Sequence, residues 1–356
     1  MTASSKPGSS GASGAAAGGG LLRVAIVGAG TLKGKELKEV LDAGSFPALD
    51  VKLLDDDDAL GQLDAVGDEA TFIQSVLPEH LEHVDLAFFA SEHEFTHKHW
   101  GTARKAGAAI VDLSYALEDE AGVPVRSPWI EQESGNGAAA PEARTVVTAH
   151  PAASVLALLL LRAQKAGAVQ RAVATVFEPV SEHGRRGMDE LHQQTVNLLS
   201  FQALPREVFD AQVAFNLLAR YGEKSAPTLE SVERRILGHL RRLTGERVPV
   251  PSVVLVQAPI FHGHVFSLYV ETVEKVSLGG LAQSLEGEHI SILHAPEDAP
   301  SNVSAAGQDQ VLLALRADRV RENAFWLWAT ADNLRIIALT AVDCATELSR
   351  ARGKVA

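Results

Sequence analysis

The chain has 356 residues, of which 46% are hydrophobic and 22% are charged, a composition typical of soluble globular proteins. Its 45 acidic residues outnumber its 32 basic ones, and this excess argues against a nucleic-acid-binding surface, which needs clustered Lys and Arg. The longest apolar runs, such as 155–161, fall far short of the roughly 20 residues that span a bilayer. A single cysteine, Cys344, excludes intramolecular disulfides and multi-cysteine metal sites, and it fits a reducing compartment. We therefore expect a cytoplasmic protein that binds neither nucleic acid nor membranes.

The first twenty residues are almost entirely Gly, Ser and Ala, with few side chains to bury. Such a segment cannot offset the conformational entropy lost on ordering. It also lacks the charged start and apolar centre of a signal peptide. Residues 1–20 are therefore predicted to form a disordered tail.

From Leu21 onward, short apolar runs alternate with helical patterns. A helix is expected over Lys33–Ala43, and 127–143 reads as a surface loop because it is polar and rich in Gly and Ala. Strands that are apolar throughout and alternate with helices predict a parallel sheet covered on both faces. Residues 21–153 should thus form a Rossmann-like domain of the α/β class. The expected strands are 21–28, 50–55, 84–90, 108–114 and 144–149.

After Pro151 the pattern changes to that of an α+β domain over 154–330. It begins with a strongly apolar helix at 154–167 and continues with amphipathic helices at 188–202 and 230–245. The last helix, 331–356, has apolar residues at helical spacing and is expected to return to the first domain. Strands of a mainly antiparallel sheet are expected at 171–181, 252–261, 264–273 and 310–317.

The first strand leads into a glycine-rich turn that contains Gly28, Gly30, Thr31 and Gly34. Between a strand and a helix, such a turn lets a pyrophosphate approach the helix N-terminus, where free N–H groups attract anions. The final glycine is one residue later than in the dinucleotide-binding pattern, so an inherited turn without a ligand stays open. The second strand ends in acidic residues 55–58. Asp55 could bind a ribose 2′-hydroxyl and would repel a 2′-phosphate, favouring NAD over NADP, although a solvated acidic loop would look the same.

The string from His93 to His97 matches the zinc-protease pattern H-E-x-x-H. On a helix the two histidines share a face, and the intervening glutamate could activate a metal-bound water. The string follows a buried strand directly, however, and no clear third ligand lies downstream. A metal site, with or without His99, and a chance match in a chain with 13 histidines both stay open.

Four segments in the second half resemble the aspartate-β-semialdehyde dehydrogenase family, and most nearly its divergent Usg-like paralogues. The likeness extends from Leu21 to the C-terminus. It implies an NADP-binding first domain, a catalytic cysteine that forms a thiohemiacetal, an acid/base histidine, and a second domain that forms a homodimer. The segments are RRGMDELHQQTVNLL, DAQVAFNLLARYGE, VVLVQAPIFHGHVFSLYVE and FWLWATADNLRIIAL.

The resemblance implies that the catalytic machinery is altered. The family's Asn-Pro-Asn-Cys turn corresponds to 150–153, which places Ala153 at the nucleophile's position, and neighbouring Ser154 has only an unactivated hydroxyl. His264 matches the acid/base histidine in the family's Pro-Val-x-x-Gly-His string. Gln257 stands where the family has a substrate-binding arginine and cannot offer a charged fork to a carboxylate.

The resemblance implies that positions binding phosphate and the cofactor differ as well. Glu118 replaces the cation that ends the family's Ser-Ser-Ala-Phe-Arg segment, and Glu92 and His93 replace a Gly-Gly turn that cradles the cofactor. The family loop Gly-Ala-Thr-Gly-x-Val-Gly becomes 28–34, with Lys33 in the place of the valine. Cys344, on the last helix at core spacing, is expected to pack as a small hydrophobe and not to substitute for the nucleophile.

These differences predict a family member without phosphorylating dehydrogenase activity, acting as a dimeric scaffold or ligand sensor. Its small-molecule or protein partner is not defined by the sequence, and NAD or NADP, if bound, should bind weakly. Two alternatives remain: an NAD(P)-dependent oxidoreductase of altered chemistry that acts on an aldehyde through His264, and a metal-dependent hydrolase around His93 and His97.

Overall fold

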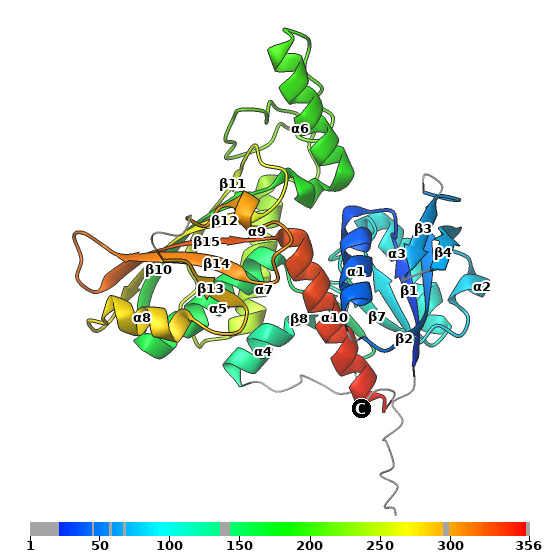
Figure 1. Ribbon diagram of the computed structural model, residues 1–356, viewed down its shortest axis with the longest axis horizontal. Coiled ribbons are helices and arrows are strands. Elements are labelled where there is room, and N and C mark those ends of the chain that lie inside the picture. Colours follow the sequence, from blue (N-terminus) through cyan, green and yellow to red (C-terminus); the bar gives the residue numbers. More distant parts are fainter. Residues whose placement is uncertain are drawn as a thin grey trace, which may run out of the picture.

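The computed structural model describes residues 21–44, 46–56, 59–66, 69–135, 143–294 and 299–353. The predicted tail, 1–20, and the last two residues of the acidic run, 57 and 58, lie outside the described residues. Figure 1 shows two α/β bodies side by side, with the last helix between them. Among the described residues, no helix is both long and apolar enough to cross a membrane.

The first domain is built on a seven-stranded sheet in the order β5-β2-β1-β6-β7-β9-β8, in which every pair is parallel. Its central strands are buried throughout, as expected when helices cover both faces of a sheet. The Rossmann-like prediction is confirmed. The strands are β1 (Leu22–Val27), β2 (Ala48–Asp55), β5 (Gln74–Ser75), β6 (Leu86–Phe89), β7 (Ala109–Asp112), β8 (Val125–Arg126) and β9 (Thr145–Thr148).

Helices on both sides of this sheet complete the domain. The last of them, α10, packs against α1 and contributes Cys344 and five neighbouring apolar residues to the core of the first domain. Burial raises the pKa of the Cys344 thiol far above its usual range, so this thiol stays protonated. The helices are α1 (Leu32–Ala43), α2 (Pro78–Leu81), α3 (His93–Lys105), α4 (Pro128–Ser134) and α10 (Asn333–Ala351); a small hairpin consists of β3 (Leu63–Val66) and β4 (Glu69–Phe72).

Two local expectations differ from the structure. The segment 127–143 is not entirely a surface loop, because it begins with α4, where Trp129 and Ile130 are buried and the Trp129 indole donates a hydrogen bond to Asp343. The last helix begins at 333 and not at 331, because Asp332 caps it by accepting hydrogen bonds from two backbone N–H groups of the first turn. A contact with α10 thus accompanies the helix at 128–134, whereas a local cap sets the start of α10.

The second domain has a six-stranded sheet in the order β11-β10-β12-β15-β14-β13. The β10–β12, β12–β15 and β14–β15 pairs are antiparallel, and β10–β11 and β13–β14 are parallel. β15 is a strand beyond those expected, and it leads directly into α10. The strands are β10 (Val169–Glu178), β11 (Ser252–Gln257), β12 (His264–Thr272), β13 (Ile290–Ile292), β14 (Val311–Ala317) and β15 (Ala324–Ala331).

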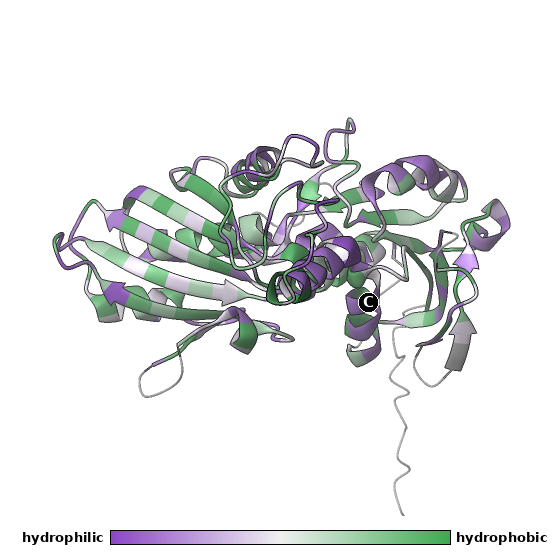
Figure 2. Cartoon of the chain, turned by 90° about the horizontal axis from the view of Figure 1, so that it is seen from above, coloured by the Kyte–Doolittle hydropathy of each residue, from purple (hydrophilic) through white to green (hydrophobic). Residues whose placement is uncertain are grey.

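One face of this sheet packs against helices from the same domain, and the hydrophobic bands that alternate along its strands are visible in Figure 2. Residues of α5 fill the centre of the core, with all positions from Pro151 to Ala163 buried. The opposite face carries half-exposed apolar side chains, among them Val173, Val254 and Trp328. The helices of this domain are α5 (Pro151–Ala166), η1 (Val180–His183), α6 (Gly184–Leu199), α7 (Leu229–Thr244), α8 (Leu278–Leu285) and α9 (Asn302–Ala305).

Candidate functional site

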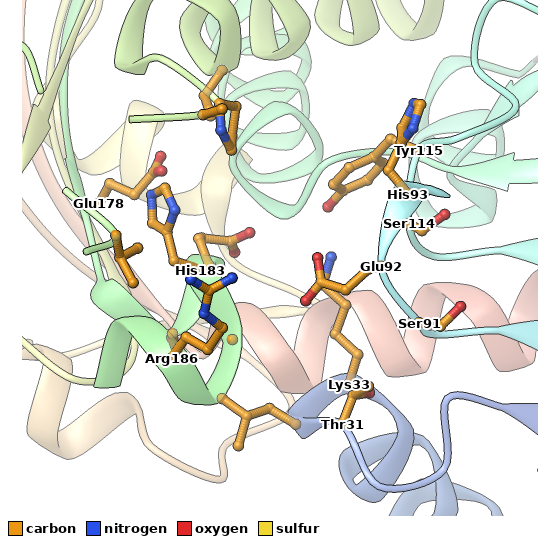
Figure 3. Close-up of a pocket in the computed structure, with 18 of the residues that line it drawn as sticks. Thr31, Lys33, Ser91, Glu92, His93, Ser114, Tyr115, Glu178, His183 and Arg186 are labelled. Atoms are coloured by element: carbon orange, nitrogen blue, oxygen red, sulfur yellow. The ribbon is translucent and has the colours of Figure 1, made fainter. Parts of the chain in front are cut away.

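A cavity of about 420 Å³ lies between the two domains, at the carboxyl ends of β1, β6 and β7. In open parallel sheets, ligands bind at this end of the strands. The first domain lines the cavity with the start of α1, the β6–α3 turn and the turn after β7, and the second domain lines it with β10, η1 and the start of α6 (Figure 3). Its polar residues include Lys33, Glu92, His93, Tyr115, His150, Glu178, Glu182, His183, Arg186, Lys224 and Arg235.

The glycine-rich turn owes its glycines to close packing. Gly28 has a φ of +93°, and a Cβ there would lie 2.5 Å from the backbone nitrogen of Ser91. A Cβ on Gly34 would lie 2.1 Å from the carbonyl oxygen of Gly28. Thr31 caps α1, since its hydroxyl oxygen accepts a hydrogen bond from the N–H of Gly34. These residues shape the entrance to α1 whether or not a ligand binds there.

Asp55 makes its contacts within the same turn. Its Oδ2 accepts a hydrogen bond from the N–H of Gly30 at 2.5 Å, and its Oδ1 accepts one from the N–H of Asp56. Only 5% of Asp55 is exposed, and burial raises the pKa of its carboxyl despite these two hydrogen bonds. The carboxylate therefore takes up a donor of the glycine-rich turn.

The residues fit a dinucleotide poorly. A bound dinucleotide would place its pyrophosphate at the N-terminus of α1 and a ribose beside the acid after β2. Here the Asp55 carboxylate is bound to the glycine-rich turn, and Glu92 adds a second carboxylate beside α1. The Lys33 side chain donates a 3.0 Å hydrogen bond to the backbone carbonyl of Leu113, just after β7. Protein groups thus occupy parts of the path that a bound dinucleotide would follow.

Position 153, where the family resemblance predicts the nucleophile, holds a buried methyl group. Ala153 lies in the first turn of α5, is 0% exposed and is not among the residues that line the cavity. The Ser154 hydroxyl is buried as well and donates a hydrogen bond to Ser127 at 3.2 Å. Among the described residues, no thiol reaches the cavity, because the single cysteine of the chain lies in the core of the first domain.

Gln257 is buried and bound entirely to protein groups. Its Oε1 accepts a 2.7 Å hydrogen bond from the Tyr221 hydroxyl, and its Nε2 donates to the backbone carbonyls of Glu178 and Ala258. The side-chain amide that replaces the family arginine therefore stabilises the wall behind the cavity. It has no free donor to offer a ligand carboxylate.

His264 lies behind the cavity wall. It is 1% exposed, its ring centroid is 5.6 Å from that of His150, and neither ring nitrogen has a hydrogen-bond partner among the described residues. Burial lowers the pKa of His264, although the carboxylates of Glu182 and Asp332 oppose this shift. The His264 imidazole is therefore neutral at pH 7. His150, and not His264, lines the cavity.

The Glu118 carboxylate is paired with two residues of α7. Its carboxylate accepts hydrogen bonds from Arg235 at 2.9 Å and from His239 at 2.8 Å. Burial alone would raise the pKa of Glu118, but these two partners outweigh it and lower the pKa. Arg235 also lines the cavity, where its charge is already paired with the Glu118 carboxylate.

Two buried carboxyl groups with opposite pKa shifts lie four residues apart, Glu178 at the end of β10 and Glu182 in η1. Burial and the charge of Glu182 raise the pKa of Glu178 well above its ordinary value, and neither of its carboxyl oxygens has a partner among the described residues. Burial disfavours ionisation of Glu182 too, but His150, His264 and Lys33, with a hydrogen bond from Asn333, lower its pKa to about 2. The site thus holds one carboxyl whose protonated form is favoured and one whose ionised form is favoured.

The sequence motif around His93 forms the first turn of α3. The rings of His93 and His97 lie 4.8 Å apart, and His93 reaches the cavity. Across the described part of the chain, no group of three or more His, Cys, Asp or Glu side chains is arranged to hold a metal ion.

Several cavity residues were not predicted from the sequence, including Lys33, Tyr115, Glu178, Glu182 and Arg235. Lys33 carries a local signal, because a lysine replaces an apolar residue inside a glycine-rich turn. The two glutamates and Arg235 carry none, since they come from segments far apart in the sequence that meet only in the folded chain.

Known proteins share both domains. The model of the semialdehyde dehydrogenase NAD-binding domain matches residues 23–138, and that of the semialdehyde dehydrogenase dimerisation domain matches 159–336. A protein of Pseudomonas aeruginosa named USG-1 protein homolog is 32% identical over 317 residues, which cover 88% of this chain and 93% of that protein. An aspartate-semialdehyde dehydrogenase of Rickettsia bellii is 28% identical and covers 91% of this chain and 97% of its own.

Solved structures agree with this result. The structure of a probable aspartate-semialdehyde dehydrogenase from Pseudomonas aeruginosa has a TM-score of 0.82 and 32% identity, and the match covers 93% of this chain and 98% of that one. Aspartate semialdehyde dehydrogenase II from Vibrio cholerae has a TM-score of 0.81 at 25% identity, covering 93% and 99%. The resemblance in sequence and the fold are therefore both confirmed. The chain belongs to the semialdehyde dehydrogenase family, with the USG-1 homologues and the aspartate-semialdehyde dehydrogenases as its relatives.

Proposed function

We propose that this protein binds a small polar molecule between its domains and does not carry out the thiol-dependent, phosphorylating oxidation implied by its family. The observation that carries the proposal is the buried methyl group of Ala153 at the nucleophile's position. A methyl group cannot add to a carbonyl, and neither Ser154 nor Cys344 reaches the cavity. The protein would act as a ligand sensor or a ligand-dependent scaffold.

The composition of the cavity supports a polar ligand. Arg235, Arg186 and Lys224 supply positive charge, and Glu92, Glu182 and Glu207 supply negative charge. The Glu178 carboxyl and the Tyr115 hydroxyl are buried without hydrogen-bond partners among the described residues. Buried polar groups without partners cost free energy, so a ligand that pairs with them gains that free energy on binding.

A homodimer is also proposed, through the outer face of the second sheet. Val254, Thr175, Ser267 and Trp328 form one row across four neighbouring strands, and Val254 and Trp328 are 52% and 41% exposed. Val173 on the same face is also exposed, and exposed apolar side chains gathered on one sheet face are typical of interaction surfaces. The match of 159–336 to a dimerisation domain supports the same assignment.

The first experiment measures activity. Purified full-length protein is incubated with aspartate semialdehyde, phosphate and NADP or NAD, next to an active aspartate-semialdehyde dehydrogenase. We expect no cofactor reduction above the background without protein. Turnover that co-purifies with this chain through a second, orthogonal column would contradict the proposal.

The second experiment measures binding by calorimetry, with butanedioate and 4-oxobutanoate as short anionic probes. Arg235→Gln removes a cation that lines the cavity, and we expect it to abolish binding. The matched control is Arg242→Gln on the same helix, whose guanidinium lies outside the cavity and pairs with Asp119. Equal loss in both variants, or no binding to the unaltered protein, would count against the cavity as a site for such ligands.

The same sample tests the two alternatives. Aldehyde-dependent oxidation of NADH or NADPH would favour an oxidoreductase of altered chemistry. Stoichiometric metal that is lost in His93→Ala and His97→Ala would favour the hydrolase.

A further inference from the structure

Lys33 is the one residue of the glycine-rich turn whose side chain extends across the cavity. It leaves the first turn of α1, and its Nζ donates a 3.0 Å hydrogen bond to the carbonyl oxygen of Leu113. The same Nζ lies 4.6 Å from the ring centroid of Tyr115 (Figure 3). The amine is thus held at a defined position inside a cavity that a small molecule can enter.

The turn that carries Tyr115 is rigidly built. The Asp112 carboxylate accepts hydrogen bonds from the N–H groups of Ser114 and Leu117 and from the Ser114 hydroxyl. This ties Tyr115 into a backbone conformation with a φ of +64°, which a bulky residue adopts only under tertiary constraint. The Tyr115 hydroxyl is buried and has no partner among the described residues. A strained tyrosine thus places an unpaired hydroxyl in the cavity that holds the amine.

The charges that face the Lys33 amine come from several elements. Burial lowers its pKa, and Arg235 on α7 adds to this effect. The carboxylates of Glu182, Glu92 and Asp112 oppose it, but the net result is still a lowered pKa. At neutral pH the uncharged fraction of the Lys33 amine is therefore larger than that of an exposed lysine. The uncharged amine is the nucleophile.

We propose that Lys33 captures aldehydes in this cavity as a reversible imine. The inference rests on the proposed function, since it requires that the cavity admit a small molecule. Lysine amines add to carbonyl compounds in this way when a site holds them uncharged. In the family pattern a valine stands at the position of Lys33, and a valine side chain cannot form an imine.

The reaction needs no oxidant or reductant. The Lys33 nitrogen forms a bond to the carbonyl carbon, and the π bond of the carbonyl breaks to give a carbinolamine. The C–O bond then breaks, and the oxygen leaves as water with one proton from the amine nitrogen and one from the solvent. A protonated imine remains on Lys33, and the reverse steps release the aldehyde.

The experiment traps this imine. Full-length protein is incubated at neutral pH with 4-oxobutanoate and sodium cyanoborohydride, which reduces the protonated imine to a stable secondary amine, and labelled peptides are identified by mass spectrometry. We expect Lys33 to carry most of the incorporated label at early times. Lys33→Arg keeps a cation and should lose most of the total label, whereas Lys98→Arg, at an exposed position of α3 outside the cavity, should keep it.

A second readout distinguishes reactivity from simple access. Labelling of Lys33 should decline less steeply with falling pH than the total labelling of the exposed lysines. Label spread evenly over surface lysines, or the same pH profile for Lys33 as for the exposed lysines, would overturn the inference. Circular dichroism and thermal unfolding of Lys33→Arg check that the variant is folded, and Lys33→Met is the replacement if it is not.

Failure of the imine and failure of the proposed function give different results. Butanedioate has no carbonyl that forms an imine, so its binding reports the cavity alone. If butanedioate binds and competes with 4-oxobutanoate but Lys33 is not labelled, the imine is refuted and the binding function stands. If neither probe binds and Lys33 is not labelled, both are refuted for this class of ligand.

Discussion

The carboxylate of Asp55 accepts a hydrogen bond from the backbone N–H of Gly30, at a distance of 2.5 Å. The acid that ends β2 is thereby turned toward the first domain's own glycine-rich turn. A Cβ on Gly30 would lie 2.9 Å from the same carboxylate oxygen, so a side chain at position 30 would displace the Asp55 carboxylate. This contact places a negative charge where a 2′-phosphate of NADP would approach.

Dinucleotide binding should therefore be weak, with NAD binding at least as tightly as NADP. Asp55→Asn keeps an oxygen that can accept from Gly30 but removes the charge, and we expect it to improve NADP relative to NAD by about tenfold. Fluorescence or calorimetric titration of both cofactors measures this ratio. Tight, NADP-selective binding to the unaltered protein would contradict the prediction, and Asp42→Asn on the exposed part of α1 serves as the control for a general charge effect.

Ala153→Cys tests whether the nucleophile alone is missing. Positions 153 and 344 are both buried, so alkylation of either thiol requires local opening of the structure. The new thiol would lie in the first turn of α5, where the helix dipole lowers a thiol pKa, whereas burial raises the pKa of the Cys344 thiol within α10. We expect position 153 to be alkylated faster than Cys344, as followed by mass spectrometry.

Turnover of aspartate semialdehyde by Ala153→Cys should nevertheless stay near zero. Gln257 is bound to Tyr221, and Glu118 stands where the family has a cation. Losing a desolvated, charge-assisted contact typically costs about 2–5 kcal/mol, and two such losses amount to several powers of ten in rate. Substantial activity from this single change would show that the substrate-binding positions have been misassigned.

Glu178→Gln should change how stability depends on pH. The pKa of Glu178 in the folded protein is raised above its ordinary value of 4.5, so its contribution to stability is fully present below about pH 4.5 and is lost as the pH rises. We expect the variant to match the unaltered protein near pH 4.5 and to exceed it at pH 8 by roughly 1 kcal/mol or more in the free energy of unfolding. Denaturant unfolding across this pH range measures the difference.

Glu182→Gln is the matched control with the opposite sign. The pKa of Glu182 is lowered to about 2, so its contribution is present above about pH 4.5 and is lost as the pH falls toward 2. This variant should be less stable than the unaltered protein at pH 7. Equal shifts of the two variants in the same direction would refute the assignment of a neutral Glu178 beside an ionised Glu182.

Val254→Asp should convert the proposed homodimer to a monomer. The substitution places a charge in the exposed row on the outer face of the second sheet, and a dimer would bury this charge without a partner. Sedimentation velocity at several concentrations gives the oligomeric state. Leu49→Asp, at an exposed position of β2 in the first domain, should leave it unchanged. An unaltered protein that is monomeric at every concentration would rule the dimer out.

Local patterns were sufficient for most of the elements. Apolar runs such as 86–89 and 109–112 predicted buried parallel strands because both faces of such a strand need apolar cover. They were not sufficient for α4, whose helix depends on Trp129 finding Asp343 on a helix more than two hundred residues later. β15 was not predicted as a strand, although its run AFWLWATA is rich in the aromatic residues that favour strands; its place between β12 and β14 is fixed only in the folded sheet.

The candidate site divides in the same way. The sequence by itself determined that position 153 is an alanine, that position 257 is a glutamine and that the glycine-rich turn holds a lysine, because these are statements about which atoms the chain possesses. Only the tertiary structure decided that the Glu118 carboxylate accepts hydrogen bonds from Arg235 and His239. It also decided that Asp55 accepts one from Gly30, and that Lys33 and Tyr115 share one cavity with Glu178 and Glu182. Charge, protonation and access depend on the distances between groups from distant segments, and those distances exist only once the two domains have packed together.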